Sequence, residues 1–447
     1  MDRVKIALEN ATQTKALLLG KGVLSSVATL FKEQFPGKKA IVVADATTYK
    51  VAGEAVYQFL KEGGVEQDAP FIFNDPDMHA EWKFIERLDA HLATTDAIPV
   101  AVGSGTINDT TKLSSSHTDR RYMIVATAAS MDGYTAFGAS ITKDGAKQTF
   151  ACPAPQALVA DIDIIATAPE DMTASGFGDL FAKVPAGADW IIADGLDVEP
   201  IDDLAFSIVQ DGLHDALSDP EGARNRDSEA LSRLIEGLLL GGFAMQAYPK
   251  SSRPASGAEH QFSHLWNMQN HVMENGVTPS HGFQVSIGTL VSLAFYEELM
   301  KSDMKAIDIE ACVEAWPTLE EAEAKAIEMF KGTDFPMIGA TEIKAKYIPK
   351  DELRQQLTLL VQNWDAMKER LSKQLVSVKE AVRRLDAVGA PTQPEQIGIS
   401  RKRLRDSIIE SQHIRRRFTI LDLAIRAGKI DEWTDNIFGK EGVWPID

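Results

Sequence analysis

Residues 15–165 alternate between short apolar runs and stretches with a helical or glycine-rich pattern. This alternation is typical of parallel strands joined by right-handed helical crossovers, because a parallel connection must carry the chain back across the sheet. We therefore predict an open, nucleotide-binding type of α/β sheet here. The expected strands are Ala16–Leu19, Ala40–Ala44, Phe71–Phe73, Ile98–Val102 and Tyr122–Ala126.

After Pro169 long segments with apolar residues at helical spacing replace the strand pattern. We predict an α/β dinucleotide-binding domain over residues 1–165 and an all-α metal- and substrate-binding domain over residues 166–447. The boundary is expected near Asp161–Glu170, where Ala-Pro-Glu is a helix start. The expected helices are Met172–Gly187, Ser228–Ala247, Phe283–Met300, Ile309–Phe330, Asp351–Leu385 and Ser400–Ala427, with loops over Lys331–Lys350 and Val388–Ile399.

Charge and cysteine content exclude several classes of protein. The net charge of −19, from 65 acidic and 46 basic residues, argues against non-specific binding to nucleic acid or to anionic membranes. We find neither a signal-peptide pattern nor an apolar run long enough to span a bilayer, so no membrane insertion is expected. The two cysteines, without a CxxC pair, predict no disulfide framework and fit a cytoplasmic location.

Histidines are concentrated in one stretch, with four of the nine between His260 and His281. His260 and His264 are four residues apart, so a helix would place them on one face. His281 follows Pro-Ser in a turn that opens the next predicted helix. Each histidine alone suits an ordinary surface or core position, but the cluster favours a metal site.

Asp179, in Gly-Phe-Gly-Asp, adds a carboxylate to the two imidazoles of His260 and His281. Three protein ligands with one open position is the catalytic arrangement for zinc, and it also suits nickel or ferrous iron. The sequence His-Gln-Phe-Ser-His lacks the glutamate of HExxH, so a zinc-protease interpretation is unsupported.

The segment IPVAVGSGTINDTTK predicts a strand, a glycine-rich turn and a helix. Gly103 and Gly105 allow close approach of a pyrophosphate to the N–H groups at the helix start. The segment departs from the Rossmann fingerprint, because a third glycine is missing and a late strand precedes it. A plain strand–helix turn is therefore the alternative.

Two other polar positions follow expected strands. Asp45 ends the run IVVAD and suits a ribose hydroxyl pair, although capping of the next helix explains it equally well. The segment VATAASMDG offers Thr127, Ser130 and Asp132 for ribose and polyol contacts, with a capped Asp-Gly turn as the alternative.

The order Asp45, GSGTIND, SMDG, GFGD, SGAEHxxxH and SHG resembles the metal-dependent polyol dehydrogenases. This family includes glycerol dehydrogenase, iron-containing alcohol dehydrogenases and dehydroquinate synthase. Within it, SMDGYTAFGAS, GFGDLFAKVPAGADW, SRPASGAEHQFSHLW and RRRFTILDLA look like the sn-glycerol-1-phosphate dehydrogenases. The resemblance covers nearly the whole chain and implies a dinucleotide domain, a helical domain and a cleft between them.

The resemblance also implies roles for individual residues. Iron-containing alcohol dehydrogenases have a histidine at the place of Lys183, which weakens the assignment of iron as the metal. Dehydroquinate synthases have a glutamate at the place of Asp179, which weakens the assignment of a synthase activity. The implied metal ligands are Asp179, His260 and His281; the cofactor contacts are Asp45, Gly103, Ser104, Gly105, Thr106, Asp109, Thr127 and Ser130; and Asp132 contacts substrate hydroxyls.

We accordingly predict metal-dependent, NAD(P)H-linked reduction of dihydroxyacetone phosphate to sn-glycerol 1-phosphate, a small phosphorylated substrate. Zinc is the expected metal, with nickel or iron as alternatives, and a homodimer is expected. His264 is the candidate proton relay, or else a packing histidine. The candidate phosphate ligands are Lys183, Lys250 and Arg253, for which a basic loop facing water is the alternative.

Two other activities stay open. A glycerol or other neutral-polyol dehydrogenase would need no phosphate ligand, and a dehydroquinate synthase-like lyase would show no net turnover of cofactor. The basic runs Arg401–Arg405 and Arg415–Arg417 predict a solvated or salt-bridged helix face, with the alternative that one arginine reaches the active site.

Overall fold

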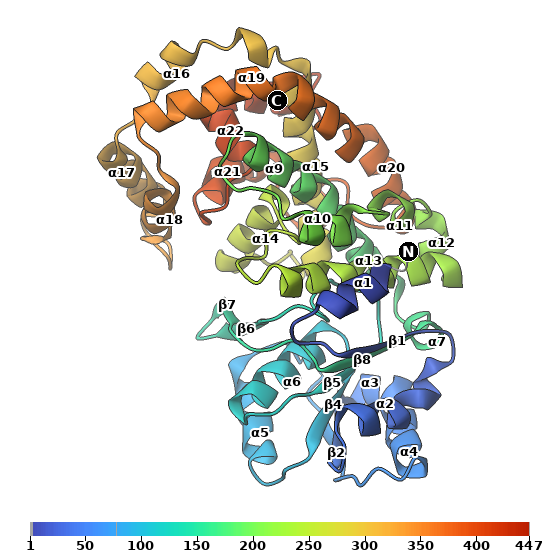
Figure 1. The fold of residues 1–447 in the computed structure, drawn as a ribbon. Coiled ribbons are helices and arrows are strands. Elements are labelled where there is room, and N and C mark those ends of the chain that lie inside the picture. Colours follow the sequence, from blue (N-terminus) through green and yellow to red (C-terminus); the bar gives the residue numbers. More distant parts are fainter. Residues whose placement is uncertain (1–2, 77, 447) are drawn as a thin grey trace. The chain divides into compact units, whose positions relative to one another are not determined.

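The strands near the N-terminus form one six-stranded parallel sheet in the order β1-β8-β5-β4-β2-β3 (Figure 1). The computed structural model describes residues 3–76 and 78–446. All five expected strands are present, and a sixth, β8, pairs with both β1 and β5. The strands are β1 (Ala16–Gly20), β2 (Ala40–Asp45), β3 (Phe71–Phe73), β4 (Ile98–Gly103), β5 (Met123–Ala126) and β8 (Ala157–Asp161).

The central strands are buried on both faces, as a parallel sheet requires. Val42, Val100 and Val102 pack against α2 (Val27–Gln34) and α4 (Glu54–Glu62). Helices α5 and α6 pack together on the other side (Figure 1). The remaining elements of this part are α1 (Arg3–Asn10), η1 (Val23–Ser26), α3 (Ala46–Thr48), η2 (Tyr49–Gly53), α5 (Trp82–Leu92), α6 (Gly105–His117) and α7 (Ile162–Ile165).

A short antiparallel hairpin, β6 (Ala139–Lys143) and β7 (Ala146–Phe150), was not among the expected strands. Ile141 of the hairpin packs in a small apolar cluster with Ile85 and Leu113. The hairpin therefore lies against α5 and α6.

The rest of the chain is helical, as expected, but several expected helices are divided, and the loop expected over Lys331–Lys350 contains a helix, α18 (Ile338–Lys346). Ser228–Ala247 forms one helix, whereas the segments 172–187, 309–330, 351–385 and 400–427 each break in two. The helices are α8 (Glu170–Phe181), α9 (Lys183–Gly195), α10 (Asp203–Gln210), α11 (Leu213–Ala216), α12 (Pro220–Arg224), α13 (Ser228–Ala247), α14 (Ala258–Met268), α15 (His281–Lys301), η3 (Met304–Ala306), α16 (Ile309–Ala315), α17 (Leu319–Met329), α18 (Ile338–Lys346), α19 (Lys350–Gln374), α20 (Val378–Val388), η4 (Pro394–Ile397), α21 (Arg401–Gln412), α22 (Ile420–Arg426) and α23 (Ile430–Phe438).

Residue contacts divide the chain into two compact units. The first comprises 1–180, 207–252 and 387–389, and the second comprises 181–206, 253–386 and 390–447. Contacts thus group α8 and α11–α13 with the sheet. These units do not coincide with the boundary expected near residue 165, and the division into two functional domains at that point stays a prediction.

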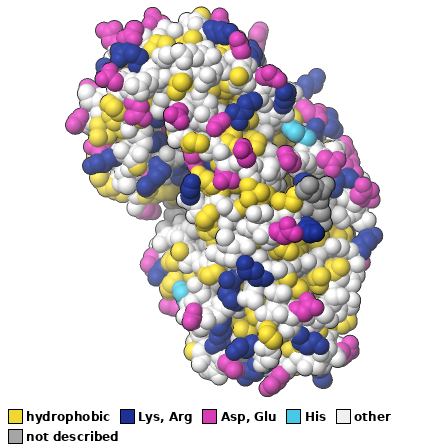
Figure 2. Space-filling model, viewed as in Figure 1, with side chains coloured by type: hydrophobic (Ala, Val, Ile, Leu, Met, Phe, Trp, Pro, Cys, Tyr) yellow, Lys and Arg dark blue, Asp and Glu magenta, His cyan; other side chains and the backbone are white. Residues whose placement is uncertain are grey.

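The second unit is built around α15, whose residues are mostly buried. Gly288 of α15 packs directly on α14, because a Cβ at this position would overlap the carbonyl oxygen of Glu259. The first turn of α14 therefore lies directly against α15 at Gly288. Among the described residues, no helix combines the length and the low charge content that a membrane crossing requires. Acidic and basic side chains are interspersed over the face drawn in Figure 2.

Candidate metal and cofactor site

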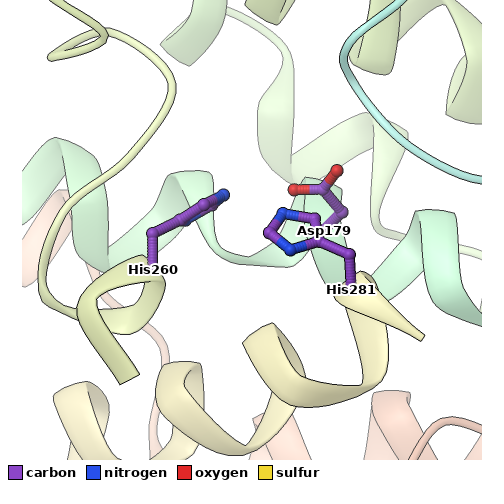
Figure 3. A group of neighbouring side chains, drawn as sticks. All are labelled: Asp179, His260 and His281. Carbon is purple, nitrogen blue, oxygen red and sulfur yellow. The ribbon is translucent and has the colours of Figure 1, made fainter. Parts of the chain in front are cut away.

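The three predicted metal ligands lie together. Asp179 is in the last turn of α8, His260 in the first turn of α14, and His281 is the first residue of α15. One ligand atom from each lies within 4.8 Å of the other two, and Figure 3 shows the three side chains converging. Asp179 and His260 are buried, and His281 is half-buried. A carboxylate and two imidazoles at this spacing are a suitable donor set for a divalent transition metal.

Hydrogen bonds orient both imidazoles. Nδ1 of His260 lies 2.9 Å from Oε1 of Glu259, and Nδ1 of His281 lies 3.1 Å from Oγ of Ser263. Because each Nδ1 is engaged, Nε2 is the nitrogen that a metal would take on each ring. Oδ2 of Asp179 accepts a hydrogen bond of 3.0 Å from the backbone N–H of Asp132.

Local sequence explains why these ligands are held in place. The Ser280 hydroxyl accepts the N–H of Phe283 and so starts α15 at His281, as the Pro-Ser-His-Gly turn predicted. Gly176 of α8 packs on the loop before Asp132, since a Cβ there would overlap the carbonyl oxygen of Ala129. The close approach of α8 to this loop brings the Asp132 N–H to the Asp179 carboxylate.

A buried carboxylate supports the start of α14. Asp189 accepts hydrogen bonds from the N–H of Ala258 at 2.7 Å, the N–H of Ile420 at 2.8 Å and the hydroxyl of Tyr296 at 2.6 Å. Burial, and next the nearby charge of Glu259, raise the pKa of Asp189 to about 7. Asp189 therefore fixes the helix start two residues before His260.

Glu259, Asp189 and Ser263 contact or support the predicted ligands but were not among the candidates predicted from the sequence. Glu259 was visible as the acidic residue directly before His260, and a histidine ligand usually hydrogen-bonds through its second nitrogen. Asp189 had no such signal, because its 69-residue separation from Ala258 shows only in the fold.

Three predicted cofactor positions follow neighbouring strands. Asp45 ends β2, Gly103 ends β4 and Thr127 follows β5, and β4 pairs with both other strands. The N–H of Thr127 donates to the carbonyl oxygen of Gly103 at 3.2 Å. Carboxyl ends of adjacent parallel strands are where open α/β sheets bind nucleotides.

The glycine-rich turn places the start of α6 at this edge. A Cβ on Gly103 would lie 2.6 Å from Cβ of Ile107, so the turn requires glycine. A Cβ on Gly105 would meet only Met131, at an ordinary 3.7 Å. Ser104 is the N-cap without a side-chain cap bond, and Gly105 and Thr106 begin the helix.

Two predicted cofactor residues have clear structural contacts. Oδ1 of Asp45 accepts the N–H groups of Thr47 and Thr48, both at 2.8 Å, which confirms the capping alternative. Asp109 accepts the N–H of Ser140 in the hairpin at 2.9 Å. Cofactor binding stays a prediction for Asp45 and Asp109. It also stays a prediction for Ser104, Thr106, Thr127 and Ser130.

A buried lysine, Lys112, forms hydrogen bonds with the backbone of the loop that carries Ser130 and Asp132. Nζ of Lys112 donates to the carbonyl oxygens of Gly133 at 3.1 Å and Gly138 at 3.0 Å, and forms an ion pair with Asp109 at 3.3 Å. This lysine was not singled out in the sequence.

The predicted phosphate ligands lie in different surroundings. Lys183 is wholly buried at the first position of α9, whereas Lys250 is exposed, with Nζ 5.3 Å from the ring of Tyr248. Arg253 is wholly buried and donates to the carbonyl oxygens of Phe418 at 2.7 Å and Asp189 at 2.9 Å. The contacts of Arg253 favour a structural role, and phosphate binding by all three stays a prediction.

His264 lies on the same face of α14 as His260, and their ring centroids are 6.3 Å apart. The spacing predicted from a helix is therefore confirmed. The side chain is half-buried. Its role as a proton relay stays a prediction.

The chain is similar to proteins that are already known. Residues 18–169 match the model of the iron-containing alcohol dehydrogenases. The glycerol-1-phosphate dehydrogenase [NAD(P)+] of Halalkalibacterium halodurans is 30% identical over 383 residues, which are 85% of this chain and 84% of the relative. The enzyme of the same name from Bacillus subtilis is 31% identical over 336 residues, or 72% and 84% of the two chains.

The fold matches that of a solved structure. The crystal structure of a probable glycerol dehydrogenase from Sinorhizobium meliloti superimposes with a TM-score of 0.58, at 17% identity, over 95% of this chain and 98% of that one. The α/β sheet with a helical C-terminal part is thus confirmed as the fold class. The identity and coverage of the curated relatives show that the chain belongs to the glycerol-1-phosphate dehydrogenase family.

Proposed function

We propose that the protein reduces dihydroxyacetone phosphate to sn-glycerol 1-phosphate with NADH or NADPH, in a reversible reaction. The observation that carries the proposal is the grouping of Asp179, His260 and His281 within 4.8 Å. Membership in the glycerol-1-phosphate dehydrogenase family supplies the substrate.

A nicotinamide cofactor bound at the carboxyl ends of the strands supplies the hydride for the ketone carbon. The open backbone at Gly105 and the first turn of α6 bind its pyrophosphate, because helix N-termini attract anions. Both capping bonds of Asp45 use Oδ1, so the same carboxylate can also receive a ribose hydroxyl through Oδ2.

A divalent metal at Asp179, His260 and His281 supplies Lewis-acid stabilisation of the negative charge that develops on the ketone oxygen. Glu259 and Ser263 fix the two ring orientations, and the Asp132 N–H fixes the carboxylate. We propose zinc as the metal, with nickel as the alternative, and metal analysis of purified protein tests this choice.

The product alcohol needs one proton in addition to the hydride. His264 is half-buried beside His260 and is the proposed carrier of this proton from solvent to the oxygen, through water. Asp132 is placed by its own backbone bond to Asp179 and is the proposed partner of a substrate hydroxyl.

The test follows NADH oxidation by metal-loaded protein with dihydroxyacetone phosphate and, separately, with dihydroxyacetone, each with and without a chelator. The proposal expects chelator-sensitive turnover of the phosphate ester and formation of the sn-glycerol 1-phosphate enantiomer. Turnover of the unphosphorylated ketone alone would assign the protein to the neutral-polyol dehydrogenases. No turnover of either ketone would refute a dehydrogenase of this type and favour the lyase.

A further inference from the structure

The segment between α21 and α22 carries three successive arginines, Arg415–Arg417. The middle one, Arg416, is exposed and forms two hydrogen bonds with Glu342, at 3.1 and 3.0 Å. Arg415 and Arg417 are half-buried. The alternation in exposure places the two outer side chains on the inner side of the segment and Arg416 on the solvent side.

This segment is fixed against the residues that lead into the metal-binding helix. Nη1 of Arg417 donates to the carbonyl oxygen of Ser256 at 2.5 Å and also to its hydroxyl. Arg253 binds the carbonyl oxygen of Phe418 at 2.7 Å. Nε2 of Gln261, the residue after His260, reaches the carbonyl oxygen of Arg417 at 3.5 Å.

All of these residues belong to the second compact unit. The bonds therefore hold Arg417 against Ser256, four residues before His260, and hold its backbone near the residue that follows His260. The inner face of the arginine segment is thus positioned beside the start of α14.

The inner face carries like charges. Burial, and then the nearby charges of Arg415 and Arg253, lower the pKa of Arg417 to about 9. Within residues 3–76 and 78–446, Arg415 forms no hydrogen bond and no ion pair. The charges of Glu342 and Glu259 act on it from beyond ion-pair distance. Two neighbouring guanidinium groups repel each other, and a bound dianion relieves this repulsion.

We propose that Arg415 and Arg417 bind the phosphate group of the substrate, with Arg253 positioning their segment rather than binding the phosphate. The proposal rests on the proposed function and specifies how a phosphorylated ketone is selected over an unphosphorylated one. A guanidinium group offers paired N–H donors that match phosphate oxygens. This proposal differs from the sequence-based prediction, which named Lys183, Lys250 and Arg253 as the candidate phosphate ligands.

The test compares R415A with R416A, a matched control on the same segment whose side chain faces Glu342. For R415A we expect the KM for dihydroxyacetone phosphate to rise roughly 10- to 100-fold, the size expected for loss of charged hydrogen bonds. The KM for NADH should stay as in the wild type. R415K should restore part of the lost affinity, and R416A should keep the wild-type constants.

Two further measurements separate this inference from the proposed function. If wild-type protein reduces the phosphate ester and R415A has an unchanged KM, the inference is overturned and the function stands. If wild-type protein does not reduce the phosphate ester, the proposed function fails. Calorimetry with inorganic phosphate then tests whether Arg415 and Arg417 form an anion-binding site. Weaker phosphate binding by folded R415A than by R416A supports the site, and equal binding overturns it.

Discussion

Nδ1 of His260 lies 2.9 Å from Oε1 of Glu259, and both side chains are buried. The carboxylate accepts the ring N–H and strengthens the other nitrogen as a metal ligand. We expect E259Q to bind a divalent metal about 10- to 100-fold more weakly, as is usual for such partners. Competition with a chromophoric chelator measures this affinity.

The matched control for E259Q is S263A, which removes the neutral hydroxyl 3.1 Å from Nδ1 of His281. We expect a smaller loss of metal affinity for S263A, because the lost hydrogen bond joins no carboxylate. Equal affinities of E259Q and the wild type would refute the role given to Glu259.

Substitutions of the two glycines in the turn between β4 and α6 distinguish an effect on stability from an effect on cofactor binding. G103A places a Cβ 2.6 Å from Ile107, so we expect a loss of roughly 1–3 kcal/mol in the free energy of unfolding. G105A meets only Met131 at 3.7 Å and should keep the wild-type Tm. If a pyrophosphate approaches this backbone, G105A raises the KM for NADH.

Urea unfolding, thermal unfolding and steady-state kinetics of both variants test this difference. A wild-type KM for NADH in folded G105A would show that the cofactor does not approach Gly105. A lowered Tm of G105A would contradict the open space seen at this position.

The sheet was predictable because its strands are apolar runs separated by helical stretches. β8, which also pairs within the sheet, was not expected, although Ala157–Asp161 is fully buried. Its five residues run directly into α7, and the segment Asp161–Glu170 was interpreted as a domain boundary. A short buried strand next to a helix has no periodicity that distinguishes the two.

Helix breaks were harder to predict than helices. The expected helix over 309–330 ends at Ala315, and Thr318 then starts α17 with a capping box to Glu321. Pro317 and the Thr-x-x-Glu pattern were visible signals of this break. The break after Gln374 has no proline, and there the N–H of Val378 donates to Glu297, a contact only the fold reveals.

The metal ligands were predictable from short motifs, whereas the residues that orient them were not. His260 and His281 stood out by residue type and by helix position. Asp189 supports α14 through Ala258, from another helix and 69 residues away. Arg253 was predicted as a phosphate ligand because it lies in a basic loop of the sequence. In the fold it is wholly buried, which favours a structural role.

Asp189 makes stability depend on pH. It faces Tyr296, Glu259 and Arg253, and its pKa is raised to about 7 from about 4. Folding therefore takes up a proton between these values, so the stabilisation is complete below about pH 4 and is lost as the pH rises through about 7. D189N cannot titrate. We expect the difference in unfolding free energy between wild type and D189N to fall by about 1.4 kcal/mol per pH unit in this window.

Urea unfolding of the metal-free proteins at several pH values measures this difference. Metal is removed from both proteins because its binding also depends on pH. A difference that stays constant between pH 4 and pH 7 would show that Asp189 has an ordinary pKa in the folded state.

Substitution of Arg253 tests whether this arginine has a structural role or binds the substrate. Its guanidinium group is wholly buried, with Nη1 and Nη2 on backbone carbonyl oxygens and Nε 3.3 Å from Glu199. R253M removes the buried guanidinium group from those carbonyls and from the ion pair with Glu199, and we expect a loss of about 3–5 kcal/mol in the free energy of unfolding. In protein that remains folded at low temperature, the KM for dihydroxyacetone phosphate should rise less than in R415A, because Arg253 acts only through the segment that it binds. A stable R253M with a KM raised as much as that of R415A would instead support phosphate binding by Arg253 itself, and paired urea unfolding and kinetics measure both quantities.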